Sequence, residues 1–130
     1  MSISLQIVTP VRQVFAGDAN EVVVPGWEGE FQVLAGHDLF LSLLRGGILS
    51  FHDEAGKEHR YVVGRGFAEA STGSVTVLTD RCESTQGVDK QQAEHDRQHA
   101  EKTMVDSSAD SSERAQAEEQ YELAVARLQA

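Results

Sequence analysis

The sequence has little cysteine, little basic charge and no long apolar run, and each shortage excludes a class of protein. The single Cys82 excludes an internal disulfide framework and a cysteine-based metal site, and it suits a reducing compartment. The net charge of -10 argues against nucleic acid and against unaided binding to anionic lipid. No membrane span and no signal-peptide pattern is visible, so we expect a soluble protein that stays where it is made.

The first two thirds of the chain read as short β-strands. Apolar residues alternate along 3–8, and residues 16–18 are expected to separate two later strands. Further strands are predicted at 11–15, 20–24, 31–35, 39–44, 48–52, 58–63, 67–70 and 74–78. Glycine, proline or acidic turns lie between them. Residues 1–87 therefore predict an all-β N-terminal sandwich or flattened barrel of eight to ten strands.

The stretch 25–37 has the clearest local pattern, in which a turn, a strand and a second turn follow one another. Glycines at 26, 29 and 36 punctuate it. The turns are expected to expose Trp27, Glu28, Glu30, His37 and Asp38. An exposed tryptophan is unusual unless a partner covers it, so this stretch is a candidate docking edge.

The composition changes near Gly87, after which glycine, proline, Phe and Trp are absent and helix formers dominate. Asp89 and Asp110 are good N-caps for helices that reach about Val105 and the C-terminus. Residues 88–130 therefore predict an antiparallel two-helix hairpin. Its apolar seam is thin and rich in alanine, so we expect the hairpin to lean on the sandwich or on a partner, and to be able to detach.

Four ordered segments carry a resemblance to a known family. They are VPGWEGEFQVLAGH at 24–37, RGGIL at 45–49, GFAE at 66–69 and VTVL at 75–78. In this order they resemble the epsilon subunit of F-type ATP synthases, called delta in mitochondria. The strand-rich first part and the helical hairpin are similar to that family's architecture over the whole chain.

The resemblance implies a non-catalytic rotor subunit of a proton- or sodium-translocating ATP synthase. Such a subunit couples the catalytic head to the c-ring, and its sandwich holds the gamma subunit. It would lie on the cytoplasmic face of the bacterial inner membrane and meet that membrane only through the complex. The resemblance matches the c-ring-facing loops to Glu28, Glu30, His37 and Asp38.

The resemblance also implies that the hairpin is regulatory. In bacterial relatives it folds against the sandwich or extends along gamma into the alpha/beta head, where it inhibits ATP hydrolysis. Here acidic residues outnumber basic ones in the second helix, which would weaken contact with an acidic region of beta. Inhibition would then be weak, or would depend on packing of Tyr121, Val125 and Leu128 against gamma. Trp27 is a further candidate for contact with gamma or with the hairpin.

Some relatives bind ATP through a motif at the start of the first helix, of the type Ile/Leu-Asp-x-x-Arg-Ala. This chain reads VDKQQA at 88–93, so Gln92 stands where the arginine belongs. The loss of a guanidinium removes a bidentate donor for phosphate. We therefore expect no cofactor, and Asp89 is a remnant of the ATP motif that serves as an N-cap.

Two other functions compete with the rotor interpretation. His95 and His99 lie one helical turn apart, a spacing that can chelate a metal, but no third ligand is specified. A sandwich that binds sugar or peptide is the other alternative. It would be stable and active without protein partners, whereas a rotor subunit would cover Trp27 only in a complex.

Overall fold

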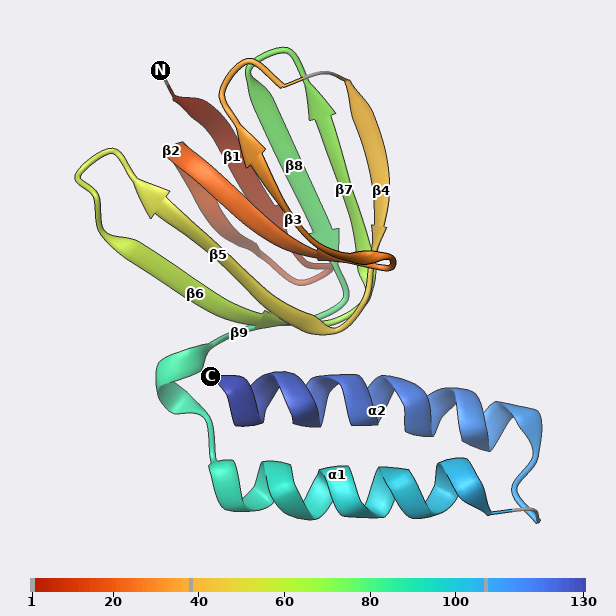
Figure 1. Cartoon of the computed structure of the whole chain (residues 1–130). Coiled ribbons are helices and arrows are strands. Elements are labelled where there is room, and N and C mark those ends of the chain that lie inside the picture. The colour runs from red at the N-terminus through yellow and green to blue at the C-terminus, as the bar shows by residue number, and fades with distance from the viewer. Residues whose placement is uncertain (1, 38, 107) are drawn as a thin grey trace.

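The computed structural model describes residues 2–37, 39–106 and 108–130, which form a nine-stranded sandwich followed by two helices (Figure 1). The strands are β1 (Ile3–Val8), β2 (Gln13–Gly26), β3 (Gly29–Leu34), β4 (Phe40–Leu44), β5 (Gly47–Asp53), β6 (Glu58–Val63), β7 (Gly66–Ser71), β8 (Ser74–Thr79) and β9 (Cys82–Ser84). The helices are α1 (Lys90–Val105) and α2 (Ser111–Gln129). The predicted fold class is confirmed.

The long strand β2 joins the two layers of the sandwich. Its first half pairs with β1, and its second half pairs with β3 and β5. The strand order β1-β8-β7-β4-β2 returns to β1 through the β1–β2 pairing, and β5, β6 and β9 extend the sheet from β2. This partial closure is the flattened-barrel arrangement, which leaves few exposed sheet edges.

The expected break at residues 16–18 is wrong, because β2 runs through it. These residues stay in the ladder with β1, where Gly17 pairs with Leu5. The ring of Phe15 lies over Gly17, where an added Cβ would come within 3.1 Å of it. The glycine is therefore there for close packing. The register irregularities of β2 fall on either side of it, between Gln13 and Phe15 against β1 and between Ala19 and Glu21 against β5.

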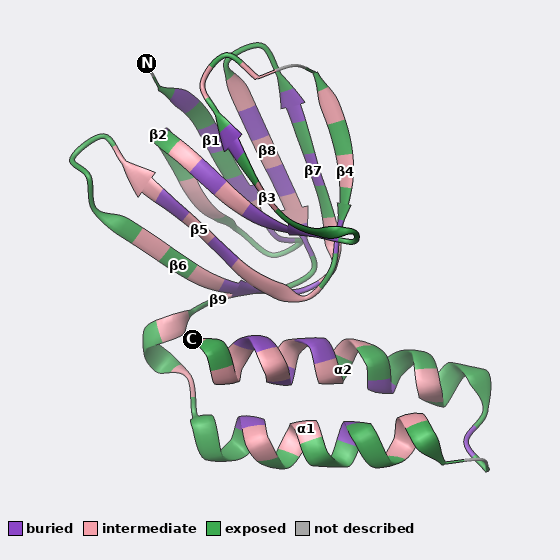
Figure 2. Ribbon diagram, viewed as in Figure 1, coloured by how far each residue is buried: buried purple, intermediate pink, exposed green. Residues whose placement is uncertain are grey.

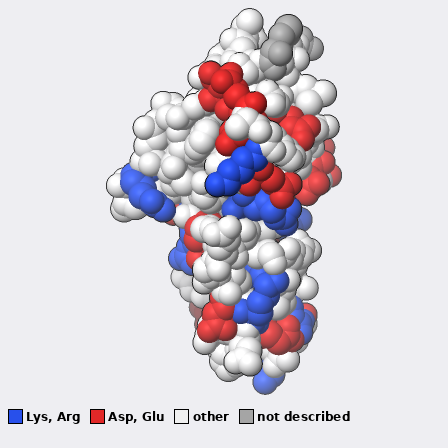
Figure 3. All heavy atoms as spheres, turned by 90° about the vertical axis from the view of Figure 1, so that its left-hand side faces the viewer, with Lys and Arg blue, Asp and Glu red and all other residues white. Residues whose placement is uncertain are grey.

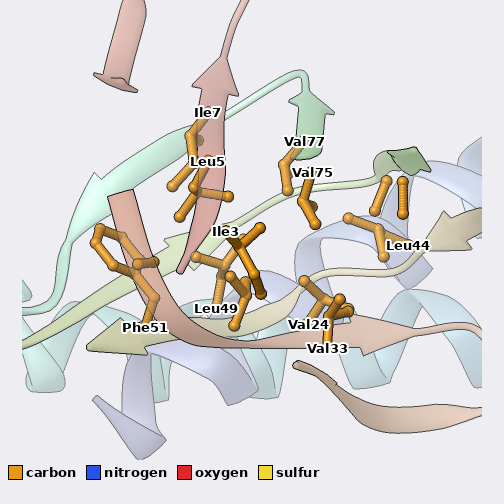
Figure 4. Packing of buried hydrophobic residues seen from close by; sticks show 14 of the residues in the cluster. Ile3, Leu5, Ile7, Val24, Val33, Leu44, Leu49, Phe51, Val75 and Val77 are labelled. Atoms are coloured by element: carbon orange, nitrogen blue, oxygen red, sulfur yellow. The ribbon is translucent and has the colours of Figure 1, made fainter. Parts of the chain in front are cut away.

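Side chains from both layers meet in one apolar core (Figure 4). Along β1 the buried positions alternate with exposed ones, as the sequence pattern predicts, and Figure 2 shows the same alternation in β7 and β8. The largest fully buried side chains are Phe51, Ile3, Leu5, Ile7, Leu44 and Leu49. This core fixes the strands from which all candidate sites project.

Both helices begin at the predicted caps. The carboxylate of Asp89 accepts the Gln92 N–H at 3.1 Å, and that of Asp110 accepts the Glu113 N–H at 2.8 Å. The Gln92 side chain does not complete a capping box but donates to Asp96 at 2.9 Å. The helices contact each other through alanines, as the thin seam predicts: Ala93, Ala100, Ala117 and Ala124 are buried.

Helix α2 lies between α1 and the end of the sandwich (Figure 1). It packs on β5 and β6, where Val62 is fully buried although it is outside the core cluster. The neighbouring Val63 belongs to that cluster, so Val62 points to the opposite side, toward the hairpin. The hairpin thus leans on the sandwich in this structure.

Candidate interaction sites

A row of exposed leucines begins just before β4 and continues along its outer face. Leu39, Leu41 and Leu43 are 73%, 70% and 64% exposed, and their spacing of two residues puts them on one face. Phe67 on β7 is paired with Leu43 and is also exposed. We call Leu39, Leu41, Leu43 and Phe67 the apolar ridge. A contiguous apolar surface of this kind is typical of a protein-binding site.

Two shallow grooves flank the ridge. One, of about 520 Å³, runs between the β2–β3 turn and β4 and is lined by Trp27, Phe31, Leu41 and Leu43. The other, of about 470 Å³, lies between β4 and β7. The backbone N–H of Trp27 donates to the Leu43 carbonyl at 3.1 Å, so the predicted docking tryptophan adjoins the ridge.

The structure separates the residues that the resemblance matches to one ring-facing surface. Glu28 lies in the β2–β3 turn and Glu30 pairs with Pro25 at the start of β3, both exposed. His37 follows the other end of β3, about 20 Å away at 3.3 Å per residue. Asp38 lies outside the described residues. Figure 1 shows the β3–β4 and β7–β8 turns at the end of the sandwich far from the hairpin.

His37 turns toward the protein and is partly buried. Its Nδ1 lies 3.0 Å from the Leu34 carbonyl, and its ring meets Phe40 edge-on at 6.1 Å. The turn is made possible by Gly36, whose φ of +84° favours glycine. The imidazole ring therefore helps to shape the connection between β3 and β4. The exposed apolar side chains beside it are those of Leu34 and Leu39.

The Trp27 side chain is less exposed than the sequence suggests, because two arginines lie against its ring. The Arg65 guanidinium lies 4.9 Å from the ring centroid and that of Arg45 lies 5.4 Å from it. These are cation–π distances. The arginine contacts hold the indole in place, while 43% of the residue stays exposed at the surface.

Both arginines also bind Glu122, a carboxylate of α2 that is only 7% exposed. Arg65 Nη2 donates to Glu122 Oε2 at 2.7 Å and Arg65 Nε to Oε1 at 3.2 Å, a bidentate pair. The Gly46 N–H donates to Oε1 at 2.8 Å, and Arg45 Nη2 lies 3.6 Å from Oε2. We call Trp27, Arg45, Gly46, Arg65 and Glu122 the latch cluster.

The latch cluster keeps the carboxylate ionised. Burial by itself would raise the pKa of Glu122, but the hydrogen bonds from Arg65 and Gly46 and the charges of Arg65 and Arg45 outweigh it, so the pKa is lowered. In the sequence Glu122 counts only as one of the acidic residues of the second helix that would weaken contact with beta, and its burial against the two arginines was not predicted. The available signal was its position within the apolar run YELAVARL at 121–128.

Other polar contacts support the docked hairpin. Arg127 Nε donates to Glu83 Oε1 at 2.7 Å, which joins α2 to β9. Lys90 at the start of α1 donates to the Leu128 carbonyl at 2.9 Å, which closes the hairpin. The predicted packing residues Tyr121, Val125 and Leu128 are each partly buried within the folded hairpin. The junction between hairpin and sandwich is therefore mostly polar.

The polar side chains of the ATP-motif remnant are engaged within helix α1. Asp89 caps α1 and the Gln92 side chain is bound to Asp96, so neither presents a donor to phosphate. The nearest cleft, about 580 Å³ between the hairpin and the β8–β9 turn, mixes Asp80, Asp96 and Glu119 with Arg81 and Arg127. The lining of this cleft therefore carries charges of both signs.

The candidate metal pair lies on the surface of α1, with His95 and His99 both exposed. Within residues 2–37, 39–106 and 108–130, no group of three or more His, Cys, Asp or Glu side chains could hold a metal ion. Burial raises the pKa of Cys82 to about 11, so its thiol is neutral at physiological pH and a poor nucleophile.

Acidic and basic side chains are intermixed on the face of the molecule that carries β5 and β6, and they meet where the hairpin joins the sandwich (Figure 3). This is not the single-sign surface of a nucleic-acid-binding protein. None of the helices in the described part of the chain combines the length and the apolar character that crossing a membrane requires.

Comparison with known proteins agrees with this architecture. The family described as "ATP synthase, Delta/Epsilon chain, beta-sandwich domain" matches residues 2–85. The ATP synthase epsilon chain of Desulfosudis oleivorans is 41% identical over 103 residues, which cover 79% of this chain and 77% of that protein. That of Maricaulis maris is 36% identical over 111 residues, which cover 85% and 82%.

The fold has a close counterpart among solved structures. A chain of the Euglena gracilis mitochondrial ATP synthase, in the OSCP/F1/c-ring assembly, superposes with a TM-score of 0.84 at 27% identity, covering 95% of this chain and 78% of that chain. A nine-stranded sandwich with a docked two-helix hairpin is therefore an architecture that solved ATP synthase structures also contain. The chain belongs to the epsilon-subunit family of F-type ATP synthases, called delta in mitochondria.

Proposed function

We propose that the chain is a non-catalytic central-stalk subunit of a proton- or sodium-translocating F-type ATP synthase. It couples the alpha/beta catalytic head to the c-ring by binding gamma. The observation that carries the proposal is the apolar ridge, because three leucines spaced by two residues, at and just before β4, remain more than 60% exposed. The relatives named as ATP synthase epsilon chains support it.

The ridge suits an apolar partner surface, which we assign to gamma. Leu41 and Leu43 offer aliphatic surface, and Phe67 and Trp27 add two aromatic rings at its borders. Aromatic residues beside an apolar centre are typical of interface hot spots. Burial of one such leucine is worth about 1.5–3 kcal/mol, so a few of them are enough for stable binding.

On this proposal, the β3–β4 and β7–β8 turns face the c-ring. They lie at the opposite end of the sandwich from the hairpin, so one subunit reaches the ring at one end while its hairpin is directed toward the head (Figure 1). His37 belongs to this end, whereas Glu28 and Glu30 lie beside the ridge and would contact gamma or its border with the ring. The subunit would lie at the cytoplasmic face of a bacterial membrane, attached only through the complex.

The hairpin is the proposed regulatory element, and no cofactor is assigned to it. In the docked form it is held on the sandwich by polar contacts, among them the Arg65–Glu122 and Arg127–Glu83 pairs, which have to break when the hairpin leaves. Extended along gamma, it would present Tyr121, Val125 and Leu128 for packing. ATP is not proposed as a ligand, since Asp89 and Gln92 are bound within the helix.

Reconstitution tests the proposal. The matching catalytic head, purified without this subunit, is assayed for ATP hydrolysis while the full chain or residues 1–87 are added back. We expect both to bind gamma and the full chain alone to slow hydrolysis. Binding without inhibition by either would reduce the function to coupling, and failure of the full chain to bind would overturn the proposal.

A further inference from the structure

We propose that Arg45, Arg65 and Trp27 form a binding site for a helix-borne carboxylate, which Glu122 occupies while the hairpin is docked. When the hairpin leaves, an acidic side chain on a helix of a partner protein takes its place. This goes beyond the proposed function, since it concerns a chemical group and a competition within this chain. It is tested on the isolated protein and does not depend on assembly.

The site is built from donors that converge on one anion. Arg65 supplies two N–H groups, the Gly46 backbone a third, and Arg45 a second positive charge at 3.6 Å. The Trp27 ring fixes both guanidiniums at its faces, at 4.9 and 5.4 Å. A preorganised pair of arginines loses little side-chain entropy when it binds a carboxylate.

The shape of the site specifies a helix as the bearer of the carboxylate. A Cβ on Gly46 would lie 2.8 Å from the Cβ of Glu122, so the glycine lets a helix backbone approach the strand end closely. The present occupant is itself a helical residue, with Ala126 buried one turn further along α2. An acidic loop or a free anion would leave this helix-wide surface uncovered.

Departure of the hairpin leaves an uncompensated cationic site beside an apolar one. Arg45 and Arg65 lose Glu122, and Arg65 also loses Glu119 at 3.5 Å. The Trp27 backbone is bonded to Leu43, so the freed arginines border the apolar ridge directly. A partner helix with one acidic residue and an apolar face complements both parts. The two occupants exclude each other, so partner binding and hairpin release are reciprocally linked.

The test compares Glu122→Gln with Glu118→Gln, which removes the same charge from an exposed position of the same helix. Amide hydrogen exchange in α2 and acrylamide quenching of Trp27, the single tryptophan, report hairpin release. We expect α2 exchange in E122Q to be at least tenfold faster than in E118Q and the wild type, with Trp27 more readily quenched. Equal exchange and quenching in the two variants would overturn the latch.

A peptide of residues 110–130 then probes the site in trans, against a twin peptide that carries Glu122→Gln. We expect the unmodified peptide to bind the E122Q chain at least tenfold more tightly than the twin does, and more tightly than it binds the wild type, whose site is occupied. Arg65→Ala in the E122Q chain should abolish the preference. Equal binding of both peptides to E122Q would overturn the carboxylate site.

Discussion

Gly46→Ala should loosen the hairpin without unfolding the sandwich. The added methyl group would lie 2.8 Å from the Glu122 Cβ and 3.3 Å from its Oε1, too close for ordinary contact. Helix α2 must move away by roughly 0.6 Å or more to restore van der Waals distance. That shift also lengthens the hydrogen bond from the Gly46 N–H to Glu122, now 2.8 Å.

The expected size of the effect follows from the two losses. Overpacking of this kind costs typically about 1–3 kcal/mol. Gly46 has no left-handed φ, so alanine adds no backbone strain. It also lowers the entropy of the unfolded chain, which stabilises the sandwich by about 0.4–1 kcal/mol but does not change the docking equilibrium, since docked and undocked forms are both folded. We expect the docked hairpin to be destabilised by about 1–3 kcal/mol, which increases its undocked fraction on the order of 5- to 150-fold.

Native-state hydrogen exchange measures this directly, because the amides of α1 and α2 report docking and those of β1 and β8 report the sandwich. Gly87→Ala is the matched control: its Cβ would meet nothing within 4 Å and its φ is also ordinary, so it shares the entropic effect alone. Faster exchange confined to the helices of G46A supports the reasoning. Exchange in G46A as slow as in G87A would refute it.

Three further predictions concern pH, the core and the cap. The lowered pKa of Glu122 means that its ionised form stabilises docking above the ordinary glutamate pKa of about 4.3, and that this contribution is lost as pH falls through the lower folded value. The protection of α2 amides, relative to their intrinsic exchange rate at each pH, should therefore fall in acid in the wild type, and an equal fall in E122Q would contradict this. Leu49→Ala should destabilise the sandwich by about 2–5 kcal/mol in chemical denaturation, whereas a loss below 1 kcal/mol would disprove its place in the core. Asp89→Ala should cost about 1 kcal/mol of α1 stability and leave any response to ATP unchanged; a melting temperature that ATP raises only when Asp89 is present would restore the nucleotide motif.

The fold could be predicted from the sequence largely because its signals are local. Alternation along β1 and the caps at Asp89 and Asp110 each depend on residues a few positions apart. The prediction of a break at 16–18 failed because a glycine is as typical of close packing, here under Phe15, as it is of a turn. Local patterns cannot tell these two uses apart.

The latch cluster could not be predicted, because it is made by contacts between distant segments. Glu122 and Gly46 are 76 positions apart, and Glu122 and Arg65 are 57 apart. Neither pairing leaves a periodic trace in one sequence. Trp27 was found as a candidate docking residue from its turn, but its arginine neighbours come from two other turns of the sandwich. The apolar ridge was likewise hidden, since Leu39 to Leu44 reads as an ordinary buried strand.

The most direct test of the central claim is the binding of the full chain to gamma within a catalytic head that lacks this subunit. Leu43→Gln removes apolar surface at the centre of the ridge, and Val105→Gln does the same at the exposed end of α1. We predict that L43Q weakens binding tenfold or more while V105Q binds like the wild type. Wild-type affinity of L43Q would show that gamma docks elsewhere and would contradict the account.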